Sequence, residues 1–299
     1  MAATAAPARA EGAAGGPGSE PGPGRAGGLR IVVTGKGGVG KTTIVAALAR
    51  RLARDGRRVL AVDADAQLNL AAALGMPRCE AEAIVPLSAN RDYIAEKTGA
   101  VPGVPGMLRL NPDVDDVVER FGRMAPDGVR FLAMGTLSAA GVGCLCPENT
   151  LLAETMRAIS LRSGEAIVLD TQAGVEHFGR AIARGFDHAV VVTDPTYSGV
   201  GVALAAAHLA RELGIPGIHL VVNRFRGEVD RIRVRDDVEA RDGGRFADWT
   251  WLPDDELVLA AEPSVDFLFE VPGEPFIAGL ESLVARIAGR VPVGAGGAR

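Results

Sequence analysis

Nine residues from Gly35 to Thr43 combine the residue types that a phosphate-binding loop requires. The sequence Gly-Lys-Gly-Gly-Val-Gly-Lys-Thr-Thr satisfies G-x-x-x-x-G-K-[ST] and lies between a predicted strand and a predicted helix. Glycines let backbone amides approach phosphate oxygens, and a helix N-terminus adds its positive end. We expect Lys41 to reach the β- and γ-phosphates of a nucleotide and the Thr42 hydroxyl to bind Mg²⁺. The expected nucleotide contacts are Gly35, Gly37, Gly38, Val39, Gly40, Lys41, Thr42 and Thr43.

Polar side chains also follow three other predicted strands. Asp63 and Asp65 stand two apart after the second strand, and a later apolar strand delivers Asp170 to the edge where Mg²⁺ is expected. Gly174 would let the backbone after Asp170 move toward a γ-phosphate and away from it. Asn223 ends another strand, and its amide offers a donor and an acceptor to the edge of adenine. Outside such a site, the same residue types at strand ends are ordinary turn formers.

A pair of cysteines, Cys144 and Cys146, is separated by a single leucine. In an extended backbone, side chains alternate with period two, so both thiols would lie on one side and could share a metal ion. Two ligands leave a tetrahedral ion half coordinated, whereas a two-fold axis through the site would supply four sulfurs. The alternative is that the two thiols pack as small apolar groups and bind nothing, as we expect for the isolated Cys79.

The elements that must position these residues alternate between short β-branched runs and longer amphipathic stretches. We predict strands at 29–33, 58–62, 129–133, 166–169, 188–192 and 219–222, and helices at 41–54, 149–161, 176–184, 200–213 and 275–288. This alternation indicates an α/β fold, a mostly parallel sheet with helices on both faces and ligands at the carboxyl ends of its strands. Residues 75–127 fit the rhythm poorly and could form a lid or an interface insertion.

Composition limits the number of domains and the classes of function. The chain has 299 residues, enough for one large α/β domain, which we place at 29–290. Residues 1–28, almost wholly Ala, Gly, Pro, Arg and Glu, are predicted to be a disordered tail, and 291–299 to fray. A net charge of −5 argues against a general nucleic-acid surface or an anionic-lipid surface. With no export signal and no membrane-length apolar run, the expected location is the cytoplasm.

Lys36 gives the phosphate loop a second lysine, and the resulting K-G-G-V-G-K-T-T resembles the deviant Walker A (SIMIBI) type of P-loop NTPase. That superfamily includes cell-division and plasmid-partition ATPases, the nitrogenase iron protein and metallocentre maturation ATPases. The resemblance implies a homodimer formed around ATP, in which Lys36 reaches the partner's nucleotide. It also implies that Asp65 orients the attacking water, that Asp63 supports Mg²⁺ through its water shell, and that Asn223 contacts adenine.

Further segments resemble the CooC family, ATPases that help insert nickel into carbon monoxide dehydrogenase. They are Ala-Val-Asp-Ala-Asp, Glu-Lys-Thr-Gly around Lys97, Leu110–Pro112, Cys-Leu-Cys-Pro-Glu-Asn at 144–149, Gly-Val-Glu-His at 174–177 and Trp-Leu-Pro-Asp-Asp-Glu at 251–256. The resemblance implies that Cys144 and Cys146 bind Ni²⁺, or Zn²⁺ in vitro, and that the partner is an apo carbon monoxide dehydrogenase-like client. Ala66-Gln67 departs from the Pro-Asn that the family often has at this position. This departure bears on the identity of the client enzyme more than on the ATPase mechanism.

Two other functions remain open on the sequence alone. The first is a positioning ATPase resembling MinD and ParA, although the acidic charge and the few cations of the C-terminal helix make a DNA or membrane partner unexpected. The second is an iron–sulfur ATPase resembling the nitrogenase iron protein, since four thiolates of a dimer could hold a cluster. The close spacing of Cys144 and Cys146 favours a single shared ion over a cluster.

Overall fold

The computed structural model describes residues 28–99, 113–135, 146–159, 161–174, 182–242 and 246–289. Its elements along the chain are β1 Leu29–Gly35, α1 Lys41–Arg54, β2 Arg58–Ala64, α2 Leu70–Ala73, α3 Arg78–Glu82, η1 Leu87–Ala89, α4 Arg91–Thr98, α5 Val117–Phe121, β3 Arg123–Met124, η2 Pro126–Gly128, β4 Arg130–Ala133, α6 Cys146–Ala158, β5 Glu165–Thr171, β6 His188–Thr193, α7 Tyr197–Glu212, β7 Gly217–Phe225, α8 Glu228–Asp242, β8 Asp248–Pro253, α9 Glu256–Ala260, η4 Phe267–Phe269 and α10 Pro275–Ile287.

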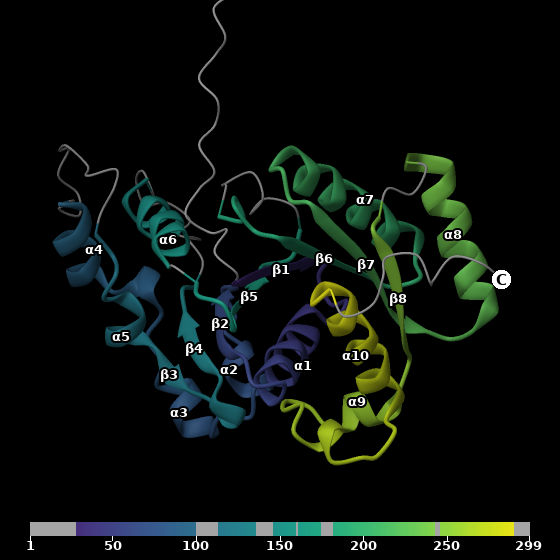
Figure 1. The fold of residues 1–299 in the computed structure, drawn as a ribbon, viewed down its shortest axis with the longest axis horizontal. Coiled ribbons are helices and arrows are strands. Elements are labelled where there is room, and N and C mark those ends of the chain that lie inside the picture. The colour runs from purple at the N-terminus through teal and green to yellow at the C-terminus, as the bar shows by residue number, and fades with distance from the viewer. Residues whose placement is uncertain are drawn as a thin grey trace, which may run out of the picture.

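One sheet runs through the molecule in the order β3-β4-β2-β5-β1-β6-β7-β8 (Figure 1). Every pairing is parallel except that of the two-residue edge strand β3, which pairs antiparallel with β4. The central strand β1, Leu-Arg-Ile-Val-Val-Thr-Gly, is buried along its whole length, as expected for a parallel strand covered on both faces. The predicted fold class is therefore confirmed.

Helices cover the sheet on both faces and close two separate apolar cores. On one face, α1 and α10 pack with alternate residues of β1 and β5 (Figure 1). On the other face, α4, α6, α7 and α8 bury the remaining residues of the same strands. In α1, apolar residues at three- and four-residue spacing, such as Ile44, Leu48 and Leu52, form the buried stripe. Thus the position of α1, which follows the phosphate loop, is set by the packing of this apolar stripe against the sheet.

Buried arginines anchor two of these helices. The side chain of Arg50 in α1 is 4 % exposed and pairs with Asp127 and Asp266, which joins α1 to η2 and to the segment before η4. Arg30 in β1 is also 4 % exposed, and its guanidinium donates to the carbonyl oxygens of Met156, at 2.8 Å, and Ile159. These carbonyls end α6, and helix carbonyls there lack partners within the helix. The C-terminal end of α6 is therefore tied to β1.

Several predicted boundaries are wrong. Helix α6 begins at Cys146 and ends at Ala158, three residues before the predicted 149–161, and α7 begins at Tyr197 instead of 200. Of the predicted helix 176–184, residues 182–184 form turns and the preceding residues lie outside the described parts of the chain. Residues 75–127 contain short elements from α3 to η2, and α4 packs on α6. The structure does not test a lid or interface role for them.

Candidate nucleotide-binding site

The phosphate loop connects β1 to α1 through glycines in conformations that other residues rarely adopt. Gly38 and Gly40 have φ angles of 76° and 91°. A Cβ atom on Gly35 would lie 2.1 Å from the Val192 carbonyl oxygen of β6, and one on Gly40 would lie 2.5 Å from Nδ2 of Asn223. The loop therefore requires glycine both for its backbone angles and for its contacts with neighbouring strands. Helix α1 then begins at Lys41, so its free amides face the loop.

Lys41 lies inside the loop and is 7 % exposed. Its Nζ donates to the carbonyl oxygen of Lys36 at 3.0 Å. Burial lowers the pKa of the ammonium, and the nearby carboxylates of Asp170 and Asp65 partly offset that effect. A desolvated ammonium inside a loop of backbone amides is suited to binding anionic phosphate oxygens.

Asp170 ends the apolar part of β5 beside Asp63 of β2, its direct neighbour in the strand register. Asp170 is 1 % exposed, and both carboxylate oxygens lack a hydrogen-bond partner among the described residues. Burial, followed by the charge of Asp63, raises its pKa to about 8, and the nearby Thr42 hydroxyl and Lys41 act in the opposite direction. A buried carboxylate without hydrogen-bond partners indicates a binding site for a cation. A divalent cation, the hard oxygen-seeking Mg²⁺ above all, fits this donor set.

Asp63 organises the loop that follows β2. It is fully buried, and its two carboxylate oxygens accept hydrogen bonds from the backbone amides of Asp65 at 2.9 Å and Leu70 at 3.0 Å. Burial raises its pKa to about 6 even though both amides favour the charged form. Asp65 is half-buried, and its carboxylate accepts from the amide of Gln67 while lining the phosphate cavity. Sequence reasoning missed the backbone-bonding role of Asp63.

The backbone after Asp170 contacts the phosphate loop directly. The amide of Gly174 donates to the carbonyl oxygen of Gly35 at 3.1 Å, which forms an isolated antiparallel bridge. Gly174 has a φ angle of 97°, a conformation that glycine adopts readily. Residues 175–181, including the predicted motif residues 175–177, lie outside the described parts of the chain. The described segment therefore reaches the loop, as expected for a switch that responds to bound phosphate.

Lys36 points to the start of α7. Its Nζ donates to Oγ of Ser198 at 2.9 Å, and the contact is exposed. Thr196 caps the same helix end, because its hydroxyl accepts from the amide of Gly199. The ammonium of Lys36, the additional lysine of the loop, therefore lies near solvent.

Two adjoining cavities lie at the carboxyl ends of the strands. The first, of about 440 Å³, is lined by the phosphate loop and by Asp65 and Gln172. The second, of about 540 Å³, is lined by Asn223 and by the segment from Pro253 to Leu259. Nδ2 of Asn223 donates to the carbonyl oxygen of Val39 at 2.8 Å, which fixes the amide against the loop. The first cavity suits a polyphosphate and the second a planar base.

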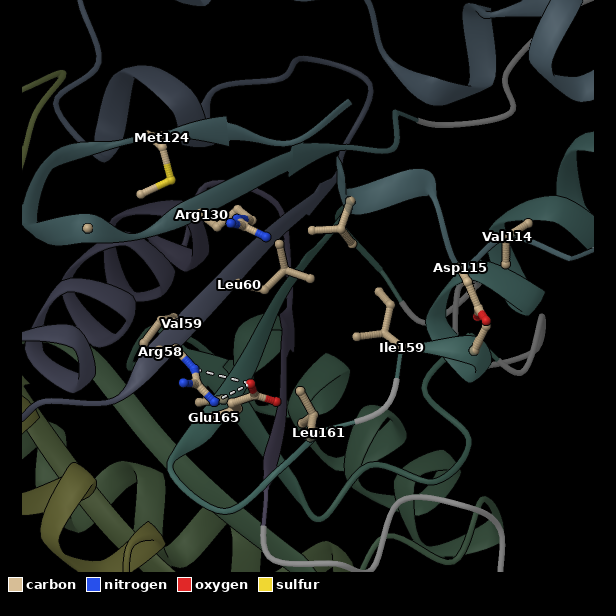
Figure 2. A pocket seen from close by; sticks show the side chains of 14 residues that line it. Arg58, Val59, Leu60, Val114, Asp115, Met124, Arg130, Ile159, Leu161 and Glu165 are labelled. Atoms are coloured by element: carbon tan, nitrogen blue, oxygen red, sulfur yellow. Dashed lines mark hydrogen bonds and ion pairs between the residues drawn. The ribbon is translucent and has the colours of Figure 1, made fainter. Parts of the chain in front are cut away.

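A larger cavity, of about 720 Å³, lies at the opposite ends of β2, β4 and β5 (Figure 2). Its lining is mostly apolar, and the paired Arg58 and Glu165 lie at one side, 2.7 Å apart. Ligands of open parallel sheets bind at the carboxyl ends of strands, where the phosphate loop is found. The larger volume is therefore not the nucleotide site.

Of the two cysteines predicted to bind Ni²⁺ or Zn²⁺, the structure describes one. Cys146 is the first residue of α6, and Cys144 lies outside the described residues. Among the residues that are described, no three His, Cys, Asp or Glu side chains gather into a metal site. The exposed Cys79 in α3 is a free thiol. Because Cys146 is the first residue of α6, its backbone is helical and not extended, as the predicted side-chain alternation would require.

A mostly parallel sheet, a glycine-rich loop before α1 and a buried lysine beside paired carboxylates define a P-loop nucleotide-binding protein. The family model of the CobQ/CobB/MinD/ParA nucleotide-binding domain matches residues 30–263. The carbon monoxide dehydrogenase accessory protein CooC of Rhodospirillum rubrum is 42 % identical over 202 residues, which cover 68 % of this chain and 76 % of CooC. An uncharacterised ATP-binding protein of Methanocaldococcus jannaschii is 37 % identical over 78 % of this chain and 88 % of its own.

Solved structures agree on the fold. MinD of Pyrococcus horikoshii, complexed with Mg-ADP, has a TM-score of 0.60 at 21 % identity and covers 88 % of this chain and 98 % of its own. The cell-division ATPase MinD of Pyrococcus furiosus has the same score at 23 % identity, with 87 % and 99 % covered. The chain belongs to the CooC family within the deviant Walker A superfamily of MinD and ParA. It is an ATPase, and its cofactors are ATP and Mg²⁺.

Proposed function

We propose that this ATPase is a dimeric metallochaperone that binds Ni²⁺, or Zn²⁺ in vitro, through Cys144 and Cys146 and assists metal insertion into a carbon monoxide dehydrogenase-type enzyme. The observation that carries the proposal is the 42 % identity to CooC in a chain that also has the Cys-x-Cys pair. Two thiolates from each of two subunits would complete a four-sulfur site. The metal site would then exist only in the dimer.

The connection between the cysteine pair and the nucleotide supports this proposal. Helix α6 begins at Cys146, and its other end is held by Arg30 of β1. Five residues further along β1 is Gly35, the first residue of the phosphate loop. One strand therefore contacts both the nucleotide loop and the helix that carries the cysteine. ATP-dependent dimerisation would act on the metal site through this strand and through the dimer interface.

In the proposed active site, Lys41 binds the β- and γ-phosphates and Lys36 acts on the nucleotide of the partner subunit. Thr42 and Asp170 would hold Mg²⁺, with Asp63 behind them, and the ion would supply charge neutralisation at the phosphates. Asp65 would orient the attacking water from the wall of the phosphate cavity. Asn223 would bind the adenine edge. The exposed contact of Lys36 with Ser198 leaves that lysine near solvent, where a partner subunit could reach it.

The cysteine assignment is tested by metal content and oligomeric state in the presence of a non-hydrolysable ATP analogue. Wild-type protein should form a dimer with one Ni²⁺ or Zn²⁺ per two subunits, whereas Cys144→Ser and Cys146→Ser should lose the metal and still bind ATP. Cys79→Ser is the matched control, because that thiol is exposed on α3 and should leave the metal content unchanged. Equal metal content in all three variants would show that Cys144 and Cys146 are not the metal ligands.

Three further outcomes distinguish the alternatives. A monomer at saturating nucleotide would exclude the shared metal site, and iron with sulfide in an anaerobic preparation would indicate a cluster instead. Nucleotide-dependent pelleting with vesicles or DNA would indicate a positioning ATPase. The structure contains, among its described residues, no helix long and apolar enough to cross a bilayer. The partner that we propose is the apo client enzyme.

A further inference from the structure

The carboxyl end of β7 departs from regular strand geometry. The register between β7 and β8 shifts between Val222 and Phe225. Within this shift, Arg224 has a φ angle of 58°, in the left-handed region that residues with a Cβ atom rarely occupy. Such backbone conformations persist where the surroundings enforce them, and they are concentrated at ligand sites. Arg224 immediately follows Asn223 of the base cavity, so its unusual backbone lies at the proposed nucleotide site.

The strained backbone directs the side chain of Arg224 to the phosphate loop. Its Nη1 donates to the carbonyl oxygen of Gly38 at 3.0 Å. Within the described parts of the chain, this carbonyl is its one hydrogen-bond partner, and no carboxylate pairs with it. Arg226, two residues later, differs because its Nε pairs with Asp254 at 2.6 Å. Arg224 therefore has unused guanidinium donors beside the phosphate loop, whereas the charge of Arg226 is already balanced by Asp254.

Arg224 also lines both cavities of the site. The residues that line both the phosphate cavity and the base cavity are Gly40, Thr43, Arg224 and Glu262. A nucleotide with its base at Asn223 and its terminal phosphates at Lys41 must pass this shared wall. The phosphate that crosses there is the one nearest the sugar. Of the shared residues, Arg224 has the cationic side chain.

We propose that the guanidinium of Arg224 binds the α-phosphate of the nucleotide held by its own subunit. A guanidinium has five N–H donors in a planar fork, and the Gly38 carbonyl uses one of them. The remaining donors match the oxygens of a phosphate, and a charge-assisted hydrogen bond of this kind is stronger than a neutral one. Arg224 would thus bind the α-phosphate, and Lys41 the β- and γ-phosphates. The role concerns nucleotide binding and does not depend on the metal cargo.

The test compares nucleotides that differ in phosphate content. Full-length wild type, Arg224→Ala and Arg224→Gly are titrated with ADP, AMP and adenosine in competition with a fluorescent ADP analogue. We expect both variants to bind ADP and AMP about tenfold to a hundredfold more weakly and adenosine unchanged, because one charged hydrogen bond is lost. Arg78→Ala, which removes an exposed arginine that pairs with Glu82 on α3 and lines neither cavity, should change all three affinities by less than about threefold.

The glycine variant separates the side chain from the backbone. Since glycine tolerates a φ angle of 58°, the melting temperature of Arg224→Gly should be equal to or higher than that of wild type. That result would exclude misfolding as the cause of weaker nucleotide binding. If Arg224→Gly bound ADP as wild type does, the guanidinium would not be a ligand. If adenosine lost as much affinity as ADP, the residue would act on the base or through the loop, and the α-phosphate assignment would be wrong.

Discussion

A chain of polar side chains at the amino-terminal ends of β6, β7 and β8 should make the protein sensitive to acid. Nδ1 of His188 lies 2.9 Å from Nε2 of His219, and Nδ1 of His219 lies 2.7 Å from Oδ2 of Asp248. Nε of Arg286 approaches the other oxygen of that carboxylate at 3.0 Å. Burial, followed by the neighbouring His219, lowers the pKa of His188 to about 4, and Asp248 offsets part of this effect.

The sign of the pH dependence follows from proton binding in the two states. Between pH 6.5 and pH 4 the unfolded chain protonates this histidine while the folded protein holds it neutral, so stability falls as the pH decreases through that window. At about 1.4 kcal/mol per pKa unit, the shift lowers the free energy of unfolding by about 3 kcal/mol when the window is crossed. Because the ring is partly exposed, we expect a measured loss of about 2 kcal/mol.

Urea denaturation at a series of pH values from 7.5 to 4.5 measures this loss. His188→Gln keeps a hydrogen-bonding side chain without a proton to titrate, so its stability should decrease less than that of wild type by about 2 kcal/mol across the window. His208→Gln is the control, since His208 has a side chain that is 67 % exposed on α7 and should reproduce the wild-type profile. Parallel profiles for His188→Gln and wild type would refute the reasoning.

Three further substitutions test the site and its support. Asp170→Asn should reduce ATP hydrolysis by at least about a hundredfold while ADP binding in EDTA persists, and Mg²⁺-dependent turnover near the wild-type rate would contradict this. Gly40→Ala, which places a Cβ atom 2.5 Å from Asn223, should lose about 1–2 kcal/mol of stability together with ATP affinity; Gly56→Ala, also at positive φ but in open space, should lose stability alone. Arg50→Met should cost about 2–3 kcal/mol in urea unfolding, because it leaves Asp266 without its arginine partner and Asp127 with Arg54 alone; unchanged stability would show that these ion pairs contribute little to folding.

The sequence predicted the elements with strong apolar patterns and missed those without. The six predicted strands are present, because each contains a run of apolar residues. Strand β8 was missed because its six residues, Asp-Trp-Thr-Trp-Leu-Pro, contain a single β-branched residue and end at a proline. Helix α8 was missed because most of its residues are charged; Val234 and Val238, four apart, are its buried anchors.

At the site, motif spacing predicted which residues meet but not how each is bonded. The parallel sheet alone brings Asp63 beside Asp170, since strand ends of a parallel sheet share an edge. The pattern contained no signal for the left-handed backbone of Arg224, which depends on a register shift between two strands. The pattern also did not indicate that both carboxylate oxygens of Asp63 accept hydrogen bonds from backbone amides. Such details depend on tertiary contacts that single-sequence patterns do not encode.

The hydrogen bonds from Arg30 to the C-terminal end of α6 have a mechanical consequence. A helix of 13 residues is about 20 Å long, and the bonds from Arg30 place its pivot at the last turn. A tilt of about 5° around that pivot would carry the far end, where Cys146 lies, through about 2 Å. The strand at the pivot need hardly move for this to occur. A small tilt at β1 would thus be amplified into a displacement of the first residue of α6, and α4, which packs on α6, would move with it.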